Sequence, residues 1–204
     1  MASRKAKNTW ILVLSAVLAV GLVALVVSLD SVAAPIDGVI RVGAVLGYLT
    51  VFLAALSSNF MRELTRFFGR PFVTVHHLAS RTALVALTVH ATGVAWRSGT
   101  LATFIPEFSS MRLFFALGGR PAFWLIAVTS TTAVLRATIG KSWKTIHWLN
   151  YVAFVLGTVH AWLIGANFQH MGVRIVSGVM AATLVVVFVL KRLQDAQRRR
   201  KRGR

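Results

Sequence analysis

The sequence predicts an all-α membrane protein, a polytopic bundle of six transmembrane helices with both termini in the cytoplasm. Three observations predict this class: an apolar composition, six apolar stretches and an uneven distribution of positive charge. Hydrophobic residues make up 56% of the 204 residues and charged residues only 14%, whereas soluble domains carry about 25% charged residues. This composition excludes a soluble domain with a single core.

Six apolar stretches are the expected spans, because a bilayer-spanning helix needs about 20 mostly apolar residues. They cover residues 10–29, 39–58, 72–96, 121–139, 146–166 and 171–191. The first is uncharged and follows basic residues, as in a signal peptide. Its apolar run exceeds the ~7–15 residues of a signal-peptide core, so we expect a retained helix.

The other five stretches follow in order. The second has Arg41 near its start, and the third contains three histidines and Arg81. The fourth begins at Pro121, which suits a first helical turn. The fifth contains two histidines, and the sixth ends at Lys191. The expected organisation is a cytoplasmic segment 1–9, a transmembrane domain 10–191 and a basic cytoplasmic tail 192–204.

The positive charges give the orientation. Seventeen of the 23 lysines and arginines lie at the N-terminus, in the second and fourth connections and in the tail. Five lie on the opposite side, and such an asymmetry places the basic side in the cytoplasm. The tail next to the last span is typical of binding to anionic lipid rather than to nucleic acid. We expect a multi-pass protein of a bacterial or archaeal plasma membrane, with membrane lipid and no nucleic acid among its partners.

The histidines are the candidate functional residues. Five of the six lie in the third and fifth stretches: His76, His77, His90, His147 and His160. Ionisable groups inside a membrane are costly and usually face a site or a cavity. The sixth, His170, lies in a short outer loop with no partner at its depth, which favours a structural role.

The spacing of these histidines places them at two depths. His76 and His90 are 14 residues apart, which falls about 40° short of four turns and separates them by roughly 21 Å on one helix face. His147 and His160 lie roughly 19.5 Å apart along the axis, with an angular mismatch of about 140° that requires a local distortion or opposed ring orientations. The angular argument favours His76 over His77, which stays the alternative.

Both helices run outward from the cytoplasm, so the histidines pair by level. His76 stands level with His147 near the inner surface, and His90 with His160 near the outer one. Two pairs at two depths are what two stacked b-type haems require, each iron held by imidazoles from facing helices.

Arg81, deep in the third span, is a candidate partner for a haem propionate, and Arg97 is another candidate at the outer end. Residues 101–117 are amphipathic and suit the outer membrane surface.

Two segments resemble the ferric reductase-like transmembrane domain superfamily. They are HHLASRTALVALTVH in the third stretch and GKSWKTIHWLNYVAFVLGTVH around the fifth. The superfamily includes ferric reductases, NADPH oxidases and the haem-binding membrane subunit of the methionine sulfoxide reductase system. The matching positions are His76, Arg81 and His90 in the third stretch and Trp143, His147, Tyr151 and His160 around the fifth. Ala79–Ser80 depart from the leucine–glycine of the motif.

The resemblance implies an oxidoreductase subunit with two haem b groups. No G-x-G-x-x-G motif follows a strand-like segment, so we expect FAD or FMN only through a partner, a separate flavoprotein reductase. Quinol is the alternative donor. The acceptor is expected at the outer face, and ferric iron, oxygen and a periplasmic or extracellular protein all stay open. A second hypothesis is a transporter or assembly protein whose histidines bind a metal ion or relay protons. The five acidic residues lie outside the spans, which disfavours a proton relay.

Overall fold

The computed structural model describes residues 2–69 and 71–202, with side chains over residues 14–69, 71–198 and 200–201. In these ranges every regular element is a helix, which confirms the predicted all-α class. Several predicted inner-side charges have side chains outside the described residues: Arg4, Lys5, Lys7, Arg70, Arg199, Arg202 and Arg204.

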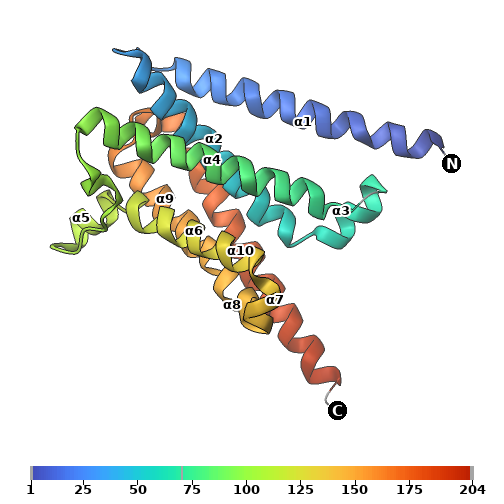
Figure 1. Ribbon diagram of the computed structural model, residues 1–204. Coiled ribbons are helices and arrows are strands. Elements are labelled where there is room, and N and C mark those ends of the chain that lie inside the picture. The colour runs from blue at the N-terminus through green and yellow to red at the C-terminus, as the bar shows by residue number, and fades with distance from the viewer. Residues whose placement is uncertain (1, 70, 203–204) are drawn as a thin grey trace.

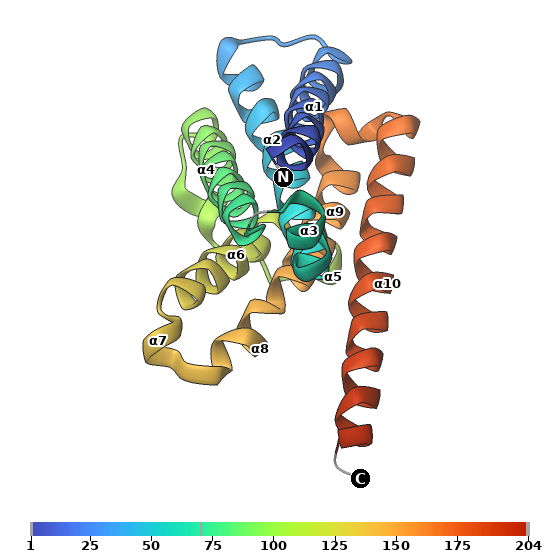
Figure 2. The ribbon, with the colours of Figure 1, turned by 90° about the vertical axis from the view of Figure 1, so that its right-hand side faces the viewer.

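Six helices form the body of the bundle (Figure 1). They are α1 (Ala2–Ser28), α2 (Pro35–Ser58), α4 (Val73–Ser98), α6 (Gly119–Val134), α9 (Leu149–Ile164) and α10 (Met171–Arg202). The connections contain α3 (Met61–Phe68), η1 (Leu101–Phe104), α5 (Met111–Ala116), α7 (Arg136–Ile139), η2 (Gly140–Ser142), α8 (Trp143–His147) and η3 (Ala166–Gln169). Figure 2 shows α10 running past the other helices, through the predicted boundary at residue 191.

The chain is a membrane protein with three helices, α2, α4 and α10, that are long and apolar enough to cross a bilayer within the described residues. A fourth candidate is a pair bent by 80°, Gly119–Val134 with Arg136–His147. Two apolar helices, Leu14–Ser28 and Leu149–Ile164, are shorter; the second, at 16 residues, is about 24 Å long. Helix length alone therefore supports three or four crossings.

The fourth and fifth predicted spans are each interrupted, the fourth at Leu135 and the fifth at Trp148. The segments on either side of Leu135 are inclined by 80°. Beyond the break, Gly140 has a φ of 68°, which favours glycine. The chain therefore turns back before the fifth span instead of continuing straight.

Glycine allows α2 and α4 to pack closely. A Cβ on Gly43 would lie 2.8 Å from the carbonyl oxygen of Ala86, and one on Gly47 would lie 2.7 Å from the Leu87 side chain. Small residues at such contacts let membrane helices approach each other. The close approach brings backbone carbonyls of α2 within reach of side chains on α4.

A buried core and a polar contact hold α2, α9 and α10 together. Leu184 and Phe154 are at most 2% exposed, and Phe154 stacks on Tyr48 with ring centroids 4.7 Å apart. The Tyr48 hydroxyl lies 3.0 Å from that of Thr158 and donates to the carbonyl of Ser177 at 3.2 Å. These contacts fix α9 against α2, which is the scaffold of the site below.

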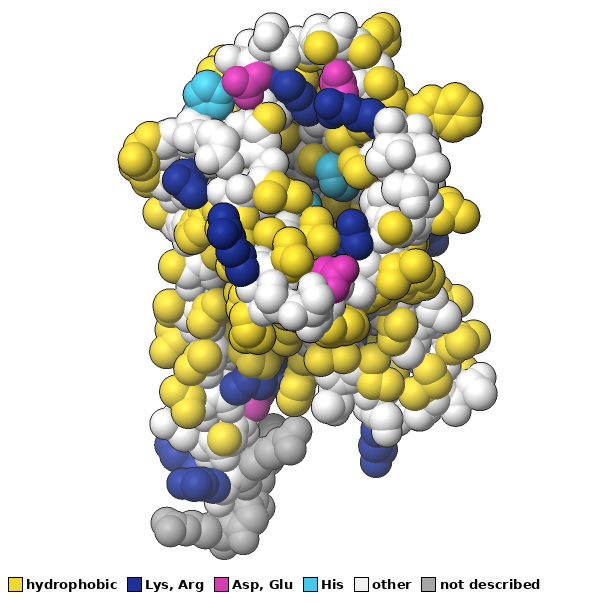
Figure 3. Space-filling model, turned by 90° about the vertical axis from the view of Figure 1, so that its left-hand side faces the viewer, with side chains coloured by type: hydrophobic (Ala, Val, Ile, Leu, Met, Phe, Trp, Pro, Cys, Tyr) yellow, Lys and Arg dark blue, Asp and Glu magenta, His cyan; other side chains and the backbone are white. Residues whose placement is uncertain are grey.

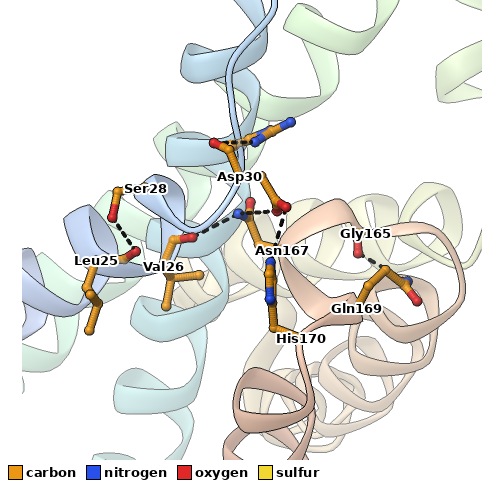
Figure 4. Close-up of polar contacts among 9 residues, drawn as sticks. Leu25, Val26, Ser28, Asp30, Gly165, Asn167, Gln169 and His170 are labelled. Carbon is orange, nitrogen blue, oxygen red and sulfur yellow. Dashed lines mark hydrogen bonds and ion pairs between the residues drawn. The ribbon is translucent and has the colours of Figure 1, made fainter.

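A polar network closes one end of the bundle (Figure 4). The amide of Asn167, a buried residue in η3, donates to the carbonyl of Val26 at 2.8 Å and to the Asp30 carboxylate at 3.1 Å. The Nε2 atom of His170 lies 3.1 Å from the other oxygen of Asp30. His170 therefore has a structural partner, and the network ties the α1–α2 connection to the start of α10.

Candidate functional site

The histidines at the inner level lie close together. His76 is on the first turn of α4 and His147 ends α8, and their ring centroids are 6.4 Å apart with the planes inclined by 67°. The ring of Trp143 also lies near His147, with centroids 5.7 Å apart. Both histidines are partly buried.

A helix break places His147 at this level. The N–H of Trp148 donates to Thr145 at 3.2 Å, and that of Tyr151 donates to Trp148 at 3.0 Å. Such i→i−3 bonds tighten the helix locally, and α8 ends at His147 while α9 begins at Leu149. This break is the local distortion that the 13-residue spacing to His160 requires.

The histidines at the outer level share a cavity of about 470 Å³, which lies in the ~300–1,000 Å³ range of cofactor pockets. His90 enters it from α4 and His160 from α9. Apolar side chains make up most of the wall, among them Val94, Phe123 and Ile126. The α6 helix comes so close that a Cβ on Gly119 would lie 2.8 Å from Nε2 of His160.

All four paired histidines present Nδ1 to a backbone carbonyl. The nitrogen-to-oxygen distances are 3.1 Å from His76 to Ala54, 3.0 Å from His90 to Ile40, 3.4 Å from His147 to Thr129 and 2.7 Å from His160 to Ala116. A carbonyl only accepts, so in His76, His90 and His160 the proton of the neutral ring belongs on Nδ1 and Nε2 keeps a free lone pair. Nδ1 of His147 also lies 3.3 Å from the side-chain amide nitrogen of Asn150, which only donates, so its two contacts favour opposite tautomers. Metal-binding histidines are oriented in this way.

The inner pair fits two imidazoles on opposite sides of one metal ion. A metal–imidazole bond is about 2 Å long, and the ring centre lies about 1 Å behind its nitrogen, so opposed rings have centres roughly 6 Å apart. The observed 6.4 Å agrees with this value. The residues present therefore fit a haem iron between His76 and His147.

Three arginines surround the mouth of the outer cavity: Arg41, Arg97 and Arg120. Figure 3 shows this face, with histidine side chains inside a hollow and basic and acidic side chains around it. Arginine binds carboxylates through paired hydrogen bonds. The arrangement suits a flat apolar ligand whose carboxylates point outward, as haem propionates would.

Two other sequence candidates lie elsewhere. Arg81 is exposed and lines a groove between α2 and α4 with Val42, Val85 and Val89, so the structure does not bring it into the cavity beside His90. His77 is exposed, and its ring is 5.9 Å from that of His76. In the described part of the chain its imidazole makes no hydrogen bond.

The connection between α4 and α6 lines part of the cavity and also carries exposed apolar side chains. Thr103 and Phe104 of η1 line the cavity, while Leu101 and Phe108 are each 75% exposed. The Ser109 N–H donates to the Glu107 carboxylate at 2.9 Å, and this bond holds the pKa of Glu107 below its usual value. The loop therefore carries a negative charge near the basic mouth.

Three residues of the site were not among the sequence candidates: Arg41, Arg120 and Gly119. By sequence, Arg41 and Arg120 are only outer charges, because nothing in their spacing relates them to the histidines. Gly119 stands two residues before Pro121, at the start of the fourth predicted span.

Two comparisons with known proteins found similar sequences. The family described as "Ferric reductase like transmembrane component" matches residues 41–158, more than half of the chain. A curated relative, the protein-methionine-sulfoxide reductase heme-binding subunit MsrQ of Herminiimonas arsenicoxydans, is 34% identical over 64 residues. These residues are 31% of this chain and 29% of the relative, so the match covers less than a third of either. No solved structure matches the chain.

Proposed function

Because the chain belongs to the family of ferric reductase-like transmembrane components, we propose that it is a haem-binding electron-transfer subunit of a membrane oxidoreductase. In this proposal His76 and His147 hold an inner haem b, and His90 and His160 hold an outer one. The observation that carries it is the shared orientation of the four imidazoles, each with Nδ1 facing a backbone carbonyl.

Different groups of the chain would orient the ligating histidines and exclude water from the haem. When bound, each haem supplies an iron that takes up and gives up one electron. The backbone carbonyls of Ala54 and Ile40 keep His76 and His90 in the tautomer and orientation that ligation needs. The apolar wall of the outer cavity excludes water, which lowers the local dielectric constant around the iron.

Arginines would hold the carboxylates of the outer haem. Arg97 and Arg120 line its cavity, and each guanidinium can donate two parallel hydrogen bonds to one carboxylate. Arg81 lies between the two histidine levels of α4 but faces the groove outside the cavity. We therefore assign the outer propionates to the cavity arginines, and Arg81 stays a candidate for the inner group only.

We propose six crossings with both termini in the cytoplasm, in a plasma membrane. The supporting observations are the positive-inside asymmetry of the sequence and six helical segments that coincide with the six apolar stretches. Helices α1 and α10 extend over 27 and 32 residues, which exceeds the ~20 that a span needs. The bent pair α6–α7 and the pair α8–α9 complete the count.

The donor and the acceptor belong to other molecules in this proposal. A separate flavoprotein carrying FAD or FMN, or a quinol, delivers electrons at the inner level. A protein or a small oxidant at the outer face receives them, in the manner that the word "subunit" in the relative's name suggests. The basic C-terminal part of α10 contacts anionic lipid at the inner surface.

A proteoliposome experiment tests this function. Purified chain is reconstituted with haem into vesicles that enclose ferricyanide, and dithionite is added outside. We expect the enclosed ferricyanide to be reduced at a rate that rises with the amount of haem-loaded chain. The variants His147→Ala and His160→Ala should each abolish that rate. Equal rates with these variants and with the intact chain would contradict the proposal.

A further inference from the structure

The outer cavity contains one carboxylate in its lining, that of Asp37 on the first turn of α2. Its side chain is 11% exposed, and Oδ1 lies 2.8 Å from the guanidinium of Arg97, which is 64% exposed. A buried carboxylate is costly unless it is paired. The position of Asp37 in the cavity wall therefore requires an explanation.

The ion pair leaves both partners incompletely bonded. Oδ1 of Asp37 is buried and accepts no well-directed hydrogen bond within the described residues, although Arg97 is close enough to attract it. Arg97 has five N–H donors, and most of its side chain stays exposed at the mouth. The pair therefore holds the Arg97 guanidinium in place while leaving donors free for another acceptor.

The other two arginines of the mouth are also anchored. Arg41 donates to the backbone carbonyl of Asp30 at 3.2 Å, and Arg120 donates to that of Ile105 at 3.0 Å. Among the lining residues, three arginines thus face one carboxylate. A ligand with two carboxylates, such as a haem, would balance these charges.

We infer that Asp37 is a positioning residue for the outer haem: its carboxylate holds Arg97 across the cavity mouth, where the guanidinium binds a propionate. This inference rests on the proposed haem site. It gives Asp37 and Arg97 opposite electrostatic effects on the outer iron. Reduction adds one negative charge to the haem, so a nearby carboxylate disfavours it and a nearby guanidinium favours it.

Redox titration of the full-length, haem-loaded chain in nanodiscs tests the inference. The outer haem is identified as the component that His160→Ala removes. We expect Asp37→Asn to raise the midpoint potential of that haem and Arg97→Gln to lower it. Asp37→Glu, which restores the charge, should return the potential toward that of the intact chain. The inner haem serves as an internal reference and should not shift.

Asp195→Asn is the control, because Asp195 lies on α10 outside the cavity lining and pairs with Arg192 at 3.2 Å. Its substitution should leave the outer potential unchanged. Loss of the outer haem in Asp37→Asn with recovery in Asp37→Glu would also support the inference. Shifts of the same sign in Asp37→Asn and Arg97→Gln, or equal effects of Asp37→Asn and Asp195→Asn, would overturn it.

The two proposals fail differently in this experiment. If the intact chain holds no haem that His160→Ala removes, the proposed function fails, and the inference fails with it. If that haem is present but its potential is the same in the intact chain and in Asp37→Asn, the proposed function stands and only the role of Asp37 is wrong.

Discussion

The imidazoles of His76 and His147 lie with their centroids 6.4 Å apart, although they come from α4 and from the short helix α8. Two features produce this contact. The break at Trp148 releases His147 from the geometry of α9, and the carbonyl of Ala54 on α2 holds the ring of His76 from behind. The contact is therefore a property of three packed elements rather than of one motif.

The glycine beside the outer histidine should be essential for haem binding. Gly119→Ala would place a methyl group 2.8 Å from Nε2 of His160, so the ring must move away from its ligating position. We expect loss of the outer haem with the inner haem retained, measured by the amplitude of the reduced-minus-oxidised spectrum. Gly172→Ala on α10, where a Cβ meets nothing within 4 Å, is the control and should keep both haems. Retention of both haems in Gly119→Ala would show that Nε2 of His160 is not the ligand.

Arginines inside and outside the cavity should differ in their effect on haem retention. Arg120→Ala removes a charged partner of a haem carboxylate, and hydrogen bonds to charged groups contribute about 1.5–3 kcal/mol, so transfer of the outer haem to excess apomyoglobin should accelerate at least tenfold. Arg81→Ala should leave that transfer unchanged, because Arg81 faces the groove. The reverse order of effects would restore Arg81 as the outer propionate partner.

The buried amide of Asn167 in η3 should contribute to the stability of the fold. Asn167→Ala leaves the carbonyl of Val26 and an oxygen of Asp30 without their donor, and each buried unsatisfied group costs roughly 1–3 kcal/mol. We expect a lower Tm in detergent. Gln169→Ala, at an exposed position of the same element, should change the Tm little. A Tm unchanged by Asn167→Ala would mean that the network does not stabilise the folded state.

The absence of cysteine from the sequence makes the orientation directly measurable. A single cysteine introduced at Ser109 in the outer loop should react with a membrane-impermeant maleimide added to intact cells. One introduced at Lys144, in α8, should react only after the membrane is opened. The physical basis is the positive-inside rule. Labelling of Lys144→Cys in intact cells would reverse the proposed orientation.

The depth pairing of the histidines could be predicted from the sequence, because the charge distribution makes the third and fifth spans parallel. The positions of the breaks at Leu135 and Trp148 could not, since both lie inside apolar stretches and an apolar pattern does not show where a helix is interrupted. The 13-residue spacing of His147 and His160 indicated only that a distortion or opposed rings were needed in the fifth stretch.

The contacts that orient the histidines could not be predicted from the sequence either. The carbonyl of Ile40 reaches His90 only because Gly43 lets α2 approach α4, and such a contact depends on packing rather than on side-chain type. The role of Arg41 and Arg120 at the cavity mouth depends in the same way on how α2 and α6 meet.

The haem-to-protein ratio of the purified chain, measured as pyridine haemochrome, is the most direct test of whether the four histidines hold two haems. We expect two haem b groups per chain in the intact protein, one in His76→Ala and two in His77→Ala. The reason is that His76 lies beside His147 and has its Nδ1 on a carbonyl. A ratio of zero in the intact chain, or loss of one haem in His77→Ala with none lost in His76→Ala, would contradict it.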